Sequence, residues 1–259
     1  MTSTAANDLA AIRARLRALA NPAVAAHAVR FFKTGAGEYG EGDRFLGIRV
    51  PVLRRVAHER RGASVATMFA LLRSPLHEER LLALLLLVAA FRSADERGRE
   101  RIYRGYVRAI RRYVNNWDLV DTSAPGIVGH LLEHRSRAPL YALARSSSLW
   151  ERRVAILATF WFIRRNDFAD TLAIAELLLA DEHDLIHKAV GWMLREAGNR
   201  DAKAAERFLA RHHRAMPRTM LRYAIEKLPA AKRRAYLEGL AATRSRARAT
   251  ATRRRPARA

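Results

Sequence analysis

Apolar residues recur along most of this chain at steps of three and four, and the β-branched alternation of strands is almost absent. The first series runs through Leu9, Ile12, Leu16 and Leu19, and such steps bring side chains to one face of a helix. The same spacing recurs in residues 52–61, 65–72, 79–91, 102–113, 154–163, 172–179, 186–194, 204–212 and 220–228. Because only 13 Gly and 8 Pro interrupt 259 residues, the pattern predicts an all-α protein.

Capping residues indicate where several of these helices begin and end. Asn21-Pro22 combines an N-cap residue with a proline at the first helical position. Comparable start signals are Ser74-Pro75, Ala138-Pro139 and Met216-Pro217, and Gly198-Asn199 is typical of a helix end.

Long amphipathic segments that begin near Pro75, Ser148 and Asp184 suggest a repeat of roughly 35 to 40 residues. Such a period is typical of a HEAT-like α-solenoid, a superhelix of antiparallel helix pairs that share one continuous core. An irregular helical bundle is the alternative. We expect a single domain over residues 1–243, in which the Gly-rich segment 34–47 is an exposed loop without the pattern of a phosphate loop.

The net charge of +23 favours a polyanionic partner. Arginine supplies 43 of the 48 basic residues, and its guanidinium binds phosphate with two hydrogen bonds, although a coding bias could also raise its share. Residues 244–259 hold seven arginines and no acid, which predicts a disordered tail. Without these seven arginines the remaining chain still carries +16.

Several classes of protein are disfavoured by composition. The chain has no Cys, which excludes disulfides, thiolate metal sites and Cys nucleophiles. Its longest apolar run, residues 81–91, is about half of the roughly 20 residues that a membrane span needs, and no signal peptide is evident. We therefore expect a cytoplasmic, nucleoid-associated protein that does not insert into membranes.

Four polar clusters could carry chemistry. In residues 115–122, Trp117 and Asp121 lie four apart and share a helix face, whereas Asp118 faces elsewhere. Helix capping by Asn116 or Asp118, with Trp117 in the core, is the alternative interpretation. In residues 150–157, Arg152 and Arg153 precede an apolar stretch, where they could meet a phosphate or simply lie in solvent beside Glu151.

The other two clusters are in the C-terminal third. Lys188, Trp192 and Arg195 form a mixed cationic and aromatic helix face, or Trp192 is core and Lys188 solvated. Gly191 in mid-helix, which costs about 1 kcal/mol against Ala, indicates close approach of a helix or ligand. Arg218 and Arg222 share a face and could hold a phosphate. The pairs His183/His187 and His130/His134 lack the glutamate of a zincin motif, so we expect no metal and no cofactor.

Four segments in register resemble the AlkD-type DNA alkylation repair glycosylases: residues 45–48, 117–121, 150–157 and 188–196. The resemblance spans most of residues 20–228. It implies a HEAT-like solenoid whose concave basic face holds duplex DNA, and hydrolytic release of N3- or N7-alkylated purines. It also implies that the backbone is gripped and that the lesion need not enter a pocket.

The resemblance also implies roles for individual residues. The catalytic aspartate falls on Asp121, its aromatic partners on Trp117 and Trp192, and the phosphate-binding arginine on Arg153. A family tyrosine falls on Phe31, where the ring is kept and the hydroxyl lost. The further DNA-binding candidates are Arg152, Lys188, Arg195, Arg218 and Arg222.

Two other functions are weighed against a monofunctional, monomeric glycosylase. A non-catalytic HEAT-like protein could bind damaged or branched DNA through shape and charge, but would not need Asp121 with its aromatic and arginine partners intact. A protein-interaction solenoid is disfavoured by the basic body of the chain. A lyase would need an amine nucleophile, for which only Lys188 is a candidate.

Overall fold

The computed structural model describes residues 2–239, although not the side chains of residues 2–5, and within this range the chain is helical without any β-strand. The helices up to Trp161 are α1 (Thr2–Ala18), α2 (Pro22–Phe31), α3 (Val50–Glu59), α4 (Val65–Leu72), α5 (His77–Ser93), α6 (Glu96–Tyr113), α7 (Trp117–Ala124), α8 (Ala138–Ala144) and α9 (Leu149–Ala158), with a π-helix at Pro125–Gly129 and a 3-10 turn at Leu132–His134. They are followed by α10 (Phe160–Ile163), α11 (Ala169–Leu177), α12 (Asp184–Arg200), α13 (Ala202–His212), α14 (Arg218–Ala224) and α15 (Ala230–Leu237). The predicted all-α class is confirmed, with an α-solenoid-like fold.

The described chain divides into two compact units, the first ending at Trp161 and the second beginning at Phe162. A single domain over 1–243 therefore stays a prediction, and the predicted disordered tail at 244–259 lies outside the described residues. None of the described helices is long and apolar enough to cross a membrane.

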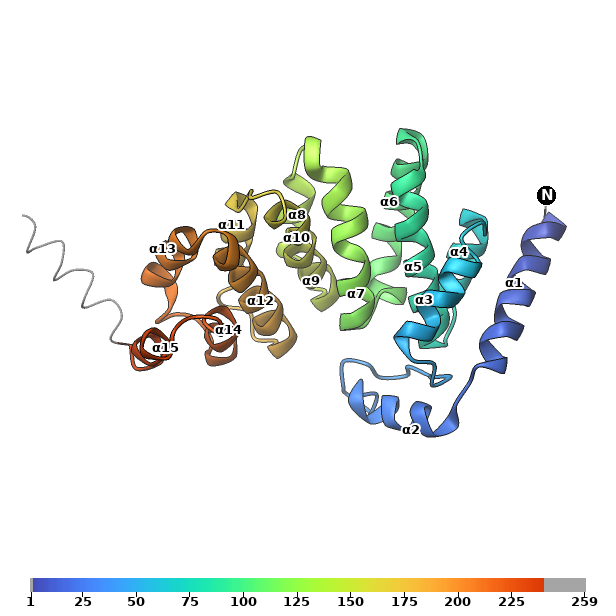
Figure 1. Cartoon of the computed structure of the whole chain (residues 1–259), viewed down its shortest axis with the longest axis horizontal. Coiled ribbons are helices and arrows are strands. Elements are labelled where there is room, and N and C mark those ends of the chain that lie inside the picture. The colour runs from blue at the N-terminus through green and yellow to red at the C-terminus, as the bar shows by residue number, and fades with distance from the viewer. Residues whose placement is uncertain (1, 240–259) are drawn as a thin grey trace, which may run out of the picture. The chain divides into compact units, whose positions relative to one another are not determined.

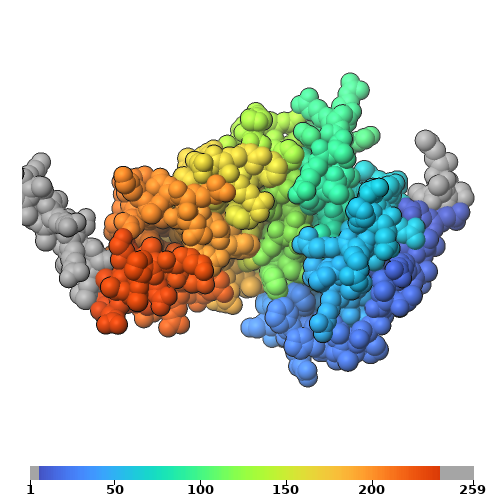
Figure 2. Space-filling model, viewed as in Figure 1, coloured from blue at the N-terminus to red at the C-terminus, as the bar shows by residue number. Residues whose placement is uncertain are grey.

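In the first unit, α5 is the central helix and contacts α3, α4, α6 and α7 (Figure 1). It contains the long apolar run of the sequence, and Leu82, Leu86 and Phe91 are buried in it, so the expected buried helix is confirmed. Helix α7 packs between α5 and α9, and side chains fill the space between neighbouring helices (Figure 2). This packing holds the motif of residues 117–121 against the core.

In the second unit, α12 is the central helix and contacts α11, α13 and α14. A Cβ on Gly191 would lie 2.4 Å from the backbone oxygen of Met220 and 2.5 Å from Cβ of Tyr223. The close approach that this glycine indicated is therefore made by α14 packing against α12.

The structure differs from the sequence predictions at several places. The helix end expected at Gly198-Asn199 is wrong, since α12 continues to Arg200, and the helix expected over 220–228 ends at Ala224. The helix expected over 154–163 is broken after Ala158, where the Thr159 hydroxyl bonds to the Ile156 carbonyl, and α10 follows. The Gly-rich segment 34–47 is only partly an exposed loop, since Gly40, Asp43 and Gly47 are buried. Gly47 has φ +78 and lies so close to Asn21 that a Cβ would meet its carbonyl oxygen at 2.0 Å, so this segment is packed onto the start of α2.

Candidate active site

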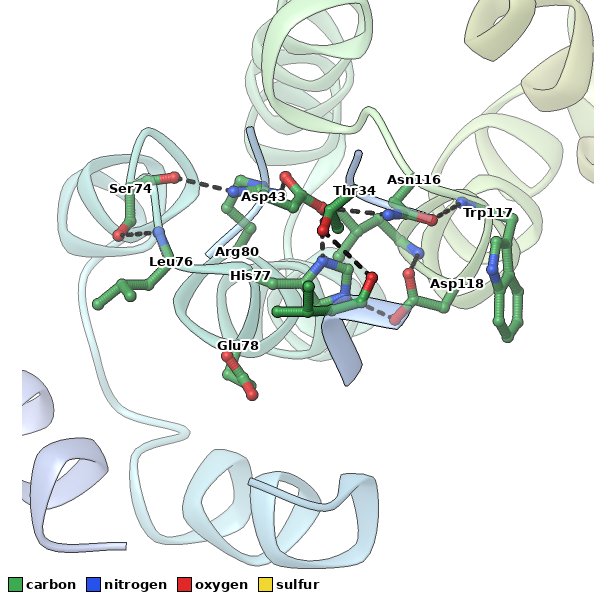
Figure 3. Close-up of polar contacts among 12 residues, drawn as sticks. Thr34, Asp43, Ser74, Leu76, His77, Glu78, Arg80, Asn116, Trp117 and Asp118 are labelled. Atoms are coloured by element: carbon green, nitrogen blue, oxygen red, sulfur yellow. Dashed lines mark hydrogen bonds and ion pairs between the residues drawn. The ribbon is translucent and has the colours of Figure 1, made fainter. Parts of the chain in front are cut away.

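Helix α7 begins at a buried N-cap. Asn116 is fully buried, and its Oδ1 accepts a hydrogen bond of 2.8 Å from the backbone N–H of Trp117. Its Nδ2 donates to Asp43 at 3.1 Å, which ties the cap to the Gly-rich segment (Figure 3). The first turn of α7 is therefore held both by its own cap and by a segment about 70 residues earlier.

Asp121, one turn further along α7, forms a two-point ion pair with Arg153 of α9. Nε of Arg153 donates to Oδ1 at 2.9 Å, and Nη2 donates to Oδ2 at 2.8 Å. The Arg153 side chain is 5% exposed and that of Asp121 17%. Such forked pairs are among the strongest hydrogen-bonded contacts in proteins, so the carboxylate has one fixed orientation.

Burial raises the pKa of Asp121 above its ordinary value, because it outweighs the opposing charge and hydrogen bonds of Arg153. The nearby charge of Asp118 raises the pKa further. Asp121 is therefore a stronger base than a free aspartate while Arg153 still favours its charged form.

A cavity of about 410 Å³ opens beside this pair. Trp117, Asp118, Asp121 and Thr122 line one side from α7, and Arg54, Leu85, Val88, Ala89 and Arg92 line it from α3 and α5. Arg54 and Arg92 are exposed, and within the described residues their side chains make no hydrogen bond or ion pair. Two exposed cations thus line the same cavity as a carboxylate that is already ion-paired with Arg153.

Trp117 also lines a smaller, apolar cavity of about 320 Å³. Its ring stacks on Phe32 at 5.5 Å and meets Phe31 edge-on at 6.0 Å. Phe31 is 56% exposed, which is unusual for a large apolar side chain. The structure thus brings Phe31 and Trp117 together, whereas one face of the Trp117 ring is covered by Phe32.

The acids and arginines near these residues agree with the sequence interpretation only in part. Asp118 and Asp121 do face different partners, as predicted, since Asp118 bonds to His77. Arg152 donates to the carbonyl oxygens of Ser146 and Ser147, and Glu151 pairs with Arg111 instead of with its neighbours.

The remaining predicted site residues lie in the second unit. Lys188 pairs with Asp184 at 2.7 Å, and Trp192 donates from Nε1 to Glu196 at 2.9 Å. Arg195 is paired with Glu196 and Glu226. Arg218 donates to the carbonyl of Leu237, whereas Arg222 is exposed without an ion pair in the described chain. The roles inferred for these residues stay predictions.

Sequence reasoning missed Asp43, His77, Arg54 and Arg92. Arg54 lies within a predicted helix and Arg92 directly follows another, but nothing in their local sequence separates them from the other arginines. Asp43 and His77 belong to a buried network whose partners are more than 30 residues apart, so no short motif marks them.

Together these features define an α-solenoid-like protein with a buried carboxylate–guanidinium pair at an open, arginine-lined cavity. The family model described as DNA alkylation repair enzyme matches residues 12–228, and the chain therefore belongs to this family. Membership implies a role in DNA repair with DNA as the substrate.

A solved structure described as a predicted DNA alkylation repair enzyme from Enterococcus faecalis is similar in fold, with a TM-score of 0.63 and 16% sequence identity. The alignment covers 82% of this chain and 97% of that one. No curated protein matched the sequence.

Proposed function

We propose that this protein is a monofunctional DNA glycosylase that hydrolyses the N-glycosidic bond of N3- and N7-alkylated purines, such as 3-methyladenine and 7-methylguanine, in duplex DNA. The observation that carries the proposal is the Asp121–Arg153 pair at the cavity that Trp117 also lines. Family membership supports the DNA substrate.

The chemistry needs only one carboxylate. An N3- or N7-alkylpurine carries a positive charge, so when the bond from C1′ to the base nitrogen breaks, the electron pair leaves with a neutral base. No general acid is therefore required, in contrast to hydrolysis of an ordinary glycoside by a pair of carboxyl groups. Water supplies the new bond to C1′ and releases one proton.

Two tasks remain for the protein, namely to stabilise the sugar cation and to accept a proton from water. Asp121 is suited to both. Its negative charge stabilises the oxocarbenium-like sugar as positive charge develops there. Its raised pKa favours acceptance of the proton from the attacking water. Arg153 keeps the carboxylate ionised and oriented in the ground state.

Trp117 offers the uncovered part of its indole to the sugar, where an aromatic face attracts a developing cation. Trp192 is proposed as a second aromatic partner on the strength of the resemblance. Phe31, which is exposed beside Trp117, is proposed as a DNA contact.

Phosphate binding is proposed for Arg54 and Arg92, because both line the Asp121 cavity without an acidic partner in the described chain. Arg153, which the resemblance implies for this role, already donates two hydrogen bonds to Asp121. Arg153 stays a proposed phosphate contact on the strength of the resemblance alone, with Arg152, Lys188, Arg195, Arg218 and Arg222 as further backbone contacts.

The test is to incubate the protein with duplex DNA that contains 7-methylguanine and to measure free base and abasic sites. The proposal predicts release of the base, an uncleaved abasic strand, and a large loss of release in Asp121→Asn. Tight binding of the duplex without base release from 7-methylguanine or 3-methyladenine would contradict it and favour the non-catalytic DNA-binding alternative. Strand cleavage at the abasic site would contradict the monofunctional reaction.

A further inference from the structure

A buried charged network lies directly against the first turn of α7. His77, the first residue of α5, is 2% exposed. Its Nδ1 lies 3.0 Å from Oδ2 of Asp43, and its Nε2 lies 2.8 Å from Oδ2 of Asp118 (Figure 3). A histidine ring can donate to a carboxylate at both nitrogens only as the doubly protonated imidazolium.

The charges of the network balance only in that state. Asp43 also accepts from Nη2 of Arg80 at 2.5 Å, so two carboxylates face two cations when His77 is protonated. Neutral His77 would leave one buried negative charge without a counter-charge, close to Asp121. Burial disfavours the imidazolium, but the charges of Asp118 and Asp43 and their hydrogen bonds outweigh it and raise the pKa of His77 to about 9.

The ring of His77 is also packed within the aromatic cluster that contains Trp117. Phe32 and Phe45 each lie 4.8 Å from the imidazole centroid, and Phe32 stacks on Trp117. Aromatic faces attract a cation, which favours the protonated ring further. His77 therefore reaches α7 by two routes, through the carboxylate of Asp118 and through Phe32 to the indole of Trp117.

We propose that His77, as an imidazolium, is a positioning residue for the glycosylase reaction: it joins Asp43 in the Gly-rich segment to Asp118 and so fixes the turn of α7 that carries Trp117 and Asp121. This inference rests on the proposed function. It also gives a function to Asp43, whose buried charge is not needed for the packing of the helices. Displacement of a catalytic group by about 1 Å can reduce a rate by about 100-fold, so a fixed turn matters to the reaction.

The first experiment compares wild type, His77→Gln and His213→Gln. Glutamine cannot carry the charge that balances Asp43 and Asp118. His213 is the matched control, a histidine that is 4% exposed with Nδ1 2.8 Å from the Leu209 carbonyl and no carboxylate partner in the described chain. The measurements are single-turnover release of 7-methylguanine, affinity for undamaged duplex, and circular dichroism.

We expect His77→Gln to release base about 10- to 100-fold more slowly, with affinity changed by less than about twofold and helical content preserved. His213→Gln should keep the wild-type rate. A rate for His77→Gln equal to that of an active wild type would overturn this inference and leave the proposed function intact, whereas an inactive wild type would overturn the proposed function itself.

Two further measurements keep the inference testable if His77→Gln fails to fold. Asp118→Asn, which removes one charge and keeps the size of the side chain, should slow base release in the same way. Nitrogen-15 NMR of the wild-type imidazoles should show both ring nitrogens of His77 protonated at pH 7.5, and a neutral ring at that pH would overturn the inference.

Because the folded-state pKa of His77 lies above the ordinary 6.5, the stability contributed by this proton is complete below pH 6.5. It is lost as pH rises through about 9.

Discussion

At the scale of single residues, the carboxylate of Asp121 combines two properties that normally oppose each other. Burial raises its pKa and makes it a better proton acceptor, while the fork of Arg153 keeps a charged form available. Removing one partner of such a buried pair costs about 3–5 kcal/mol. Asn also removes the charge of Asp121, but it keeps nearly the same shape and one oxygen that can accept from Arg153, so it disturbs the packing least.

The pH dependence of catalysis follows from this pair. The reaction needs the ionised carboxylate, so the rate of base release should fall as pH drops through the raised pKa of Asp121, above the range of an ordinary aspartate. The measurement is single-turnover release of 7-methylguanine from pH 4 to 8, corrected for release without protein. A rate that stays constant down to pH 4 would contradict an essential, desolvated carboxylate.

At the scale of elements, α12 can pack closely on α14 because Gly191 has no side chain. Gly191→Ala should lower the free energy of unfolding by about 1–3 kcal/mol, despite the better helix propensity of alanine, because the added Cβ would overlap Met220 and Tyr223. Denaturant titration followed by circular dichroism measures the change.

Gly62→Ala is the control, since nothing lies within 4 Å of the position of its Cβ. If Gly62→Ala leaves the free energy of unfolding unchanged and Gly191→Ala does not lower it, then α12 and α14 do not approach as closely as described.

The sequence was most informative about individual helices and their caps. Local spacing predicted the buried helix over residues 81–91, and the cap at Asn21 is present, with its Oδ1 accepting from Ala23 and Val24. The shared helix of Trp117 and Asp121 is local as well and was predictable. The pairing of Asp121 with Arg153 and of His77 with Asp43 was not, because these partners lie 32 and 34 residues apart and meet only when helices pack.

At the scale of the whole molecule, the net charge of +23 predicts a steep dependence of DNA affinity on salt. Arg54→Gln and Arg92→Gln should each reduce the slope of log affinity against log salt by about one and weaken binding to damaged and undamaged duplex alike. Arg104→Gln, which removes an exposed cation already paired with Glu100, should change the slope less.

Fluorescence anisotropy over a range of salt concentrations measures these slopes. Slopes for Arg54→Gln and Arg92→Gln that equal the wild-type slope would remove both residues from the proposed phosphate contacts, without any bearing on Asp121.

The most direct test of the account is the rate at which Asp121→Asn releases 7-methylguanine from duplex DNA under single-turnover conditions. Glu151→Gln is the matched control, because Glu151 also forms a two-point pair with an arginine, 2.9 Å from both Nε and Nη2 of Arg111, outside the cavity. We predict a loss of about 100-fold or more for Asp121→Asn, with DNA affinity retained, and a rate close to wild type for Glu151→Gln. An Asp121→Asn protein that releases the base as fast as wild type would contradict the central claim.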